Sequence, residues 1–124
     1  MTRSRASAKK AGTAFETLIA NYLAATVDDR IERRTKNGSK DRGDISGVRH
    51  MGERVVVEVK DFGGQLRIGE WLTEVDVERL NDDAVSGFVV AKRRGTTNPA
   101  DQIVLLTLGD LVALFTGERP SGVD

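Results

Sequence analysis

The chain has 124 residues, enough for one domain with a hydrophobic core and too few for two ordinary domains. Its 39% hydrophobic and 31% charged residues predict a globular protein. No apolar run reaches the roughly 20 residues of a membrane span, and the first residues lack the apolar core of a signal peptide, so we expect a cytoplasmic protein with no membrane contact. The absence of cysteine excludes disulfides, thiolate zinc sites and thiol nucleophiles, and His50 is the only histidine. Chemistry must therefore rest on carboxylates, lysine and a hard cation.

The net charge of zero hides an asymmetry along the chain. Residues 1–42 hold ten Lys/Arg against five Asp/Glu, whereas residues 43–124 hold nine against fourteen. Such a separation can bring a polyanion to one surface while acidic groups act nearby, although two solvated faces would give the same count.

In chain order, a flexible basic arm is expected over residues 1–7, and apolar residues at helical spacing predict a helix over 8–25. Strands are expected near 30–35, 43–49 and 53–60, followed by a helix over 68–82. A strand at 86–92, a basic loop, a strand at 103–107 and a helix at 109–115 complete a single domain over 8–118, with a tail at 119–124. The order α-β-β-β-α-β-β-α predicts an α/β fold in which helices flank a mixed central sheet, with one parallel crossover through the second long helix.

The strand over residues 53–60 ends with two opposite charges, Glu58 and Lys60, on either side of Val59. A three-residue hairpin loop over 50–52 would pair Arg49 with Glu53 and place Asp44 opposite Glu58. Because side chains alternate along a strand, Lys60 joins these two carboxylates on one face, while valines occupy the other. Two carboxylates in one partly buried place repel each other, and a divalent cation such as Mg²⁺ would remove that penalty.

Gly43-Asp44 followed fourteen residues later by Glu58-Val59-Lys60 resembles the core of the PD-(D/E)XK nuclease superfamily, which has a restriction-endonuclease-like core. With Glu16 on the preceding helix and the "DRGDISG" loop, the chain is most similar to archaeal and phage-type Holliday junction resolvases. The resemblance covers about residues 8–92. Gly43 stands where the family usually has proline.

The resemblance implies roles for individual residues. Asp44, Glu58 and the backbone carbonyl of Val59 would bind Mg²⁺, for which Mn²⁺ can substitute, and Glu16 would bind it directly or through water. Lys60 would position the nucleophilic water and stabilise the transition state. Gln65 could assist near the metal, and Ser39 is the candidate for a serine that resolvases carry before the aspartate.

Each of these residues also has a simpler structural explanation. Glu16 completes the capping-box pattern Thr13-x-x-Glu16, so it could serve only to begin a helix. Glu58 and Lys60 could form an ordinary solvated sheet face with Arg49 and Arg54. His50 fits a polar loop residue, and Trp71 fits the core of its helix better than a platform for base stacking.

Basic residues surround the proposed site in sequence, and they could hold DNA phosphates without reading bases, or serve only for solubility. The candidate DNA-binding residues are Arg3, Arg5, Lys9, Lys10, Arg33, Arg34, Lys36, Ser39, Lys40, Arg42, Lys92, Arg93 and Arg94. The sequence thus predicts a Mg²⁺-dependent, structure-selective endonuclease for branched or double-stranded DNA, acting as a homodimer. A nicking or restriction-like endonuclease, or a non-catalytic DNA-binding module on the same fold, are the alternatives.

Overall fold

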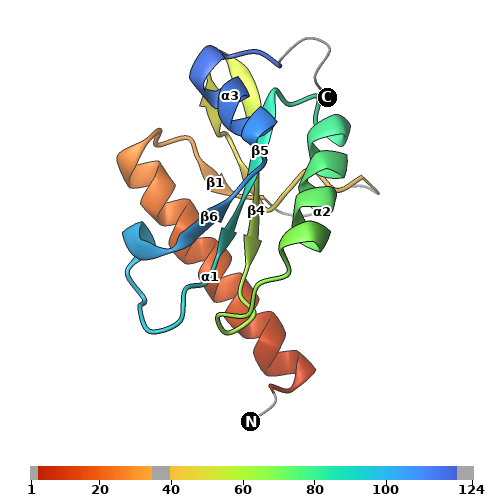
Figure 1. Cartoon of the computed structure of the whole chain (residues 1–124). Coiled ribbons are helices and arrows are strands. Elements are labelled where there is room, and N and C mark those ends of the chain that lie inside the picture. Colours follow the sequence, from red (N-terminus) through yellow and green to blue (C-terminus); the bar gives the residue numbers. More distant parts are fainter. Residues whose placement is uncertain (1–2, 35–39, 120–124) are drawn as a thin grey trace.

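A computed structural model describes residues 3–34 and 40–119 (Figure 1). Its elements are α1 (Arg5–Thr26), β1 (Glu32–Arg33), β2 (Ile45–Ser46), β3 (Arg49–His50), β4 (Glu53–Lys60), α2 (Ile68–Asn81), β5 (Ser86–Ala91), the 3₁₀ turn η1 (Pro99–Asp101), β6 (Ile103–Leu105) and α3 (Leu108–Thr116). The α/β class is confirmed. Within the described ranges, no helix combines the length and the apolar composition required to cross a membrane.

The sheet is mixed and mostly antiparallel. Its strand order is β1-β2-β4-β5-β6, and β3 pairs with β4 outside this path. Among these pairings β4 with β5 is parallel, and α2 joins the two strands, as the sequence predicts. The ends of β4 and β5 therefore meet at one edge of the sheet, together with the start of α2.

Two helices cover opposite faces of the sheet, as Figure 1 shows for α1 and α2. The valines at alternate positions of β4 pack with Ile45 against Phe15 and Ile19 of α1. On the other face, Trp71 and Val75 of α2 pack on Val89 and Ala91 of β5. Since side chains alternate along β4, Glu58 and Lys60 point toward the α2 face rather than toward open solvent.

The first helix differs from the prediction at its start. α1 begins at Arg5, and the side chain of Ser4 caps it by accepting a hydrogen bond from the backbone N–H of Ser7. The flexible arm predicted for residues 1–7 is therefore helical from Arg5 onward. Glu16 lies in the middle of α1, so the capping-box explanation for it is wrong.

The hairpin also differs, because its turn has two residues rather than three. Met51 and Gly52 both have positive φ, as a type I′ turn requires, and Arg49 pairs with Arg54 instead of Glu53. His50 belongs to β3 rather than to the loop. Between these pairs and β2, the β2–β3 side of the hairpin has one residue more than the facing part of β4. Ile45 therefore pairs with Val57, which is the register that the sequence predicts there.

Trp71→Ala should lower the free energy of unfolding by about 3–5 kcal/mol, because the Trp71 side chain is 1% exposed in the α2 core and would leave a cavity. The matched control is Leu80→Ala on the same helix, whose side chain is 65% exposed. Its effect should stay within about 0.5 kcal/mol. Urea denaturation followed by circular dichroism measures both, and equal losses would contradict the burial of Trp71.

Candidate active site

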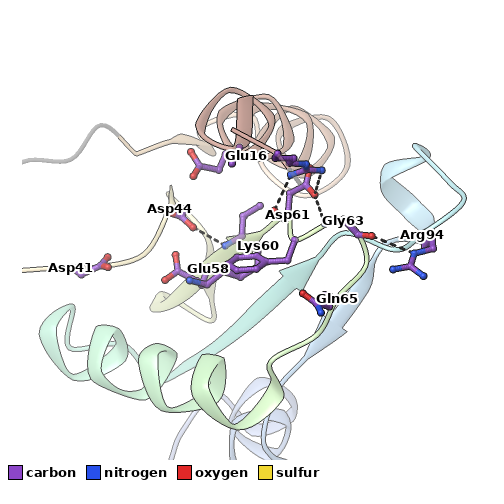
Figure 2. A pocket seen from close by; sticks show the side chains of 14 residues that line it. Glu16, Asp41, Asp44, Glu58, Lys60, Asp61, Gly63, Gln65 and Arg94 are labelled. Atoms are coloured by element: carbon purple, nitrogen blue, oxygen red, sulfur yellow. Dashed lines mark hydrogen bonds and ion pairs between the residues drawn. The ribbon is translucent and has the colours of Figure 1, made fainter. Parts of the chain in front are cut away.

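A cavity of about 820 Å³ opens where β4 ends. It is lined by carboxylates and basic groups from α1, from the loop before β2 and from β4 (Figure 2). Four of the residues predicted for a catalytic site line it: Glu16, Asp44, Glu58 and Lys60, with Val59 between the last two. Gln65 lines the same cavity.

Asp44 is fixed to the end of β4 by two hydrogen bonds. Its backbone N–H donates to the carbonyl of Val57 at 2.9 Å, and its Oδ2 accepts from the backbone N–H of Val59 at 2.7 Å. The Asp44 carboxyl is therefore held beside Glu58, with which it also shares a hydrogen bond. The predicted meeting of Asp44 and Glu58 is present in the structure.

Burial governs the protonation of these acids. Burial, together with the hydrogen bond and charge of Glu58, raises the pKa of Asp44 to about 8. Burial also raises the pKa of Glu58 to about 8, and Glu78 acts in the same direction. Asp44, Glu58 and Glu78 are thus neighbouring acids whose pKa values lie near neutral pH. This pattern is expected where a cation is needed to stabilise the ionised carboxylates.

Lys60 forms an ion pair with Glu74 of α2 at 2.8 Å. Burial alone would lower the pKa of Lys60, but the hydrogen bond to Glu74 and the charges of Glu58 and Glu74 together raise it. Lys60 is thus protonated at neutral pH. It can stabilise negative charge or orient a water, but it is a poor base for deprotonating that water.

Two further acids were missed by the sequence analysis. Asp41, Glu58 and Glu78 each offer a carboxylate oxygen, and these oxygens lie within 4.8 Å of one another. Glu78 is only 3% exposed, and its Oε2 has no hydrogen-bond partner in the described part of the chain. Burial, with Asp41 beside it, raises the pKa of Glu78 to about 7. This all-oxygen donor set fits a hard divalent cation such as Mg²⁺.

Glu16 reaches the cavity from α1, but its carboxylate is already engaged. Its Oε2 accepts a hydrogen bond from Nε of Arg33 at 2.8 Å. Arg33 thus forms an ion pair with Glu16, although its side chain stays 43% exposed.

Among the other basic candidates, Arg34 lies 3.9 Å from Asp82, and the rest divide into three groups. Arg3 and Arg94 line the cavity, and Arg3 pairs with Asp61 at 3.2 Å. Lys92 is occupied, because its amine donates to the carbonyls of Arg93 and Thr96 within its own loop. The exposed candidates are Arg5, Lys9 and Lys10 on α1, with Lys40, Arg42 and Arg93 in loops. Lys36 and Ser39 lie outside the described residues, as do 120–124 of the predicted tail.

No family model matches the sequence, and no curated protein or solved structure is significantly similar to the chain. The resemblance to nucleases therefore rests on the sequence motif around Asp44, Glu58 and Lys60, and it stays a prediction.

The buried carboxyls of Asp44, Glu58 and Glu78 make stability depend on pH. Their raised pKa values mean that the folded protein binds more protons than the unfolded chain between the ordinary carboxyl pKa of about 4 and about pH 8. In EDTA, the free energy of unfolding should therefore fall as pH rises through this window and level off above it. Urea denaturation at several pH values measures this.

Glu78→Gln removes one of these acids and should flatten the pH dependence, whereas Glu70→Gln on the exposed side of α2 should leave it unchanged. A free energy of unfolding that rises from pH 5 to pH 8 in the unmodified protein would contradict the buried, protonated cluster.

Gly43 allows the chain to approach β4 closely enough to place Asp44. Its φ is +92°, and a Cβ there would lie 3.0 Å from both Val56 Cγ1 and the carbonyl oxygen of Val57. Proline, which the family usually has here, cannot adopt this φ. The local backbone at Gly43 therefore does not allow the proline that PD-(D/E)XK nucleases usually have before the aspartate.

Gly43→Ala should cost the left-handed penalty of about 1–2 kcal/mol and a further ~1–3 kcal/mol for crowding against β4. Gly52→Ala is the matched control, since φ is +83° but no atom lies within 4 Å of its Cβ position. Gly52→Ala should therefore lose only the about 1–2 kcal/mol that the left-handed conformation costs. Chemical denaturation of both variants provides the measurement, and equal losses would exclude the close approach at Gly43.

Proposed function

We propose that the protein is a Mg²⁺-dependent DNA endonuclease of the PD-(D/E)XK type, with a Holliday junction as its preferred substrate. One observation carries the proposal: the 2.7 Å bond from the Val59 N–H to Asp44, which holds the aspartate against the Glu58-Val59-Lys60 strand. Asp, Glu and Lys in this arrangement, inside a cavity at the end of a sheet, are what metal-assisted phosphodiester hydrolysis requires.

Asp44 and Glu58 would hold the cation, with the carbonyl of Val59 completing the set that the resemblance implies. Asp41 and Glu78 extend the oxygen donors on the α2 side. A bound Mg²⁺ would supply Lewis-acid stabilisation and lower the pKa of a bound water. Lys60, kept protonated by Glu74, would orient the water and offset negative charge that develops on the phosphate.

Binding of the DNA backbone is supported by basic groups next to the carboxylates. Arg3 and Arg94 line the cavity together with the carboxylates, and exposed Lys9 and Lys10 lie on α1. Such contacts track phosphates and recognise DNA shape rather than sequence. A four-way junction has two equivalent strands to cut, so a homodimer with two active sites suits this substrate.

Two alternatives remain within the same fold. A nicking or restriction-like endonuclease would use the same carboxylates on other DNA. A non-catalytic binding module would not depend on them, yet the buried Glu78 oxygen without a partner favours a site that takes a cation.

The test is cleavage of a synthetic four-way junction beside matched linear duplex and flap DNA, in Mg²⁺, Mn²⁺ or EDTA. We expect paired symmetric nicks in the junction, with 5′-phosphate ends, that EDTA abolishes. Lys60→Ala and Asp44→Asn should each lower the single-turnover rate by about 10²-fold or more, because the first removes the positive charge that offsets the reacting phosphate and the second removes a charged ligand of the cation.

Glu70→Gln, an exposed carboxylate change on α2, is the control and should cut normally. Equal cutting of every DNA would replace the resolvase by a general nuclease. Tight DNA binding without cutting in either metal would refute the endonuclease proposal and favour the non-catalytic DNA-binding module.

A further inference from the structure

A second recess lies beside the segment that carries Asp41 and Asp44. It has a volume of about 190 Å³, against roughly 30 Å³ for one water molecule in the liquid, so a phosphate-sized group fits. Four arginines line it: Arg34, Arg42, Arg49 and Arg54. Asp82 is the acidic residue among the lining groups.

Positive charge in this recess is only partly compensated. Asp82 lies 3.9 Å from both Arg34 and Arg54, at the limit of an ion pair. Arg49 donates to the carbonyl of Gly52, which carries no full charge. Asp82 is thus near two of the four arginines that line the recess, and a group with negative charge would lower the mutual repulsion of the four.

Two further features point to an absent anion. Arg49 and Arg54 stand directly opposite each other in the β3–β4 pair, where like charges destabilise a sheet. In addition, Nε of Arg34 is buried and has no hydrogen-bond partner among the described residues. An anion in the recess would relieve both defects, and guanidinium groups bind phosphate oxygens through paired N–H donors.

The recess is connected to the candidate active site through the backbone. Arg42 belongs to the segment between Asp41 and Asp44, and the N–H of Arg34 donates to the carbonyl of Asp44 at 2.7 Å. On the α2 side, Asn81 holds the carbonyl of Asp41 at 2.9 Å, next to Asp82. A DNA strand that enters the cavity could therefore place another of its phosphates here.

We propose that the arginine recess binds a backbone phosphate of the DNA substrate, remote from the phosphate that is cut. This inference rests on the proposed function for its substrate but not on turnover. It assigns Arg49 and Arg54, which the sequence analysis left outside the DNA-binding set, to substrate binding.

The test measures affinity for a labelled four-way junction by fluorescence anisotropy in EDTA, over a range of salt concentrations. Arg54→Gln should weaken binding about 5–10-fold and reduce the slope of log K against log salt by roughly 0.9, the value for one phosphate contact. Arg54→Lys should retain most of the slope. Arg30→Gln removes the same charge from an exposed residue paired with Asp28, and should change the affinity less than about twofold.

A second measurement uses inorganic phosphate against chloride at equal ionic strength. Phosphate should raise the Tm of the unmodified protein more than that of Arg54→Gln, whose side chain is half exposed and whose fold should persist. Binding by Arg54→Gln that equals the Arg30→Gln control in affinity and slope would overturn the proposal. Phosphate stabilisation through Arg54 without any change in DNA affinity would also overturn it, since the recess would then hold free phosphate.

Because affinity is read in EDTA, this result is separate from cleavage. A protein that binds as expected but never cuts would refute the endonuclease and leave the recess intact. If the protein cuts DNA but Arg54→Gln binds DNA like the control, the recess proposal would be refuted and the endonuclease would stand.

Discussion

The hydrogen bond from the Val59 N–H to the Asp44 carboxylate is the contact on which the candidate site depends. It joins a loop to the end of the central strand, and it can form only because Gly43 passes β4 in a conformation with positive φ. The bond also holds the Asp44 carboxyl in a buried place beside Glu58. Burial, with the hydrogen bond and charge of Glu58, raises the pKa of Asp44, while the Val59 N–H itself acts in the opposite direction. The hydrogen bond therefore sets the geometry of the site, whereas burial is the main cause of the raised pKa values.

The parallel crossover explains why the site is enclosed on one side. Since α2 must lie on the sheet to connect β4 with β5, one stripe of the helix faces the strand that carries Glu58 and Lys60. Glu74 and Glu78 are in that stripe, following Trp71 and Val75 at helical spacing. The helix therefore contributes core residues and carboxylates in alternation along one stripe, and Lys60 obtains a partner that keeps it charged.

The sequence predicted much of this arrangement because the strongest signals are periodic. Alternating valines identified β4 and its buried face, and the helical stripe of α2 was read correctly from Trp71 and Val75. The same stripe reaches Glu78, which was missed because a carboxylate at a buried helical position breaks the apolar pattern instead of extending it. The turn at Met51 and Gly52 was misjudged because positive φ at methionine leaves no trace in composition, and the paired arginines depend on that register.

Charged side chains form two separate clusters in the structure, and these clusters do not follow the two halves of the sequence. Acidic groups gather at the end of β4, whereas arginines gather at the opposite end of the hairpin strand, and the segment from Asp41 to Asp44 contributes to both. Each cluster is unfavourable alone, since like charges share a confined volume. A polyanion with its counter-cation would compensate the two together: the cation among the carboxylates and the phosphate among the arginines. A net charge of zero therefore does not exclude binding of a polyanion, because the arginines of the recess form a local excess of positive charge.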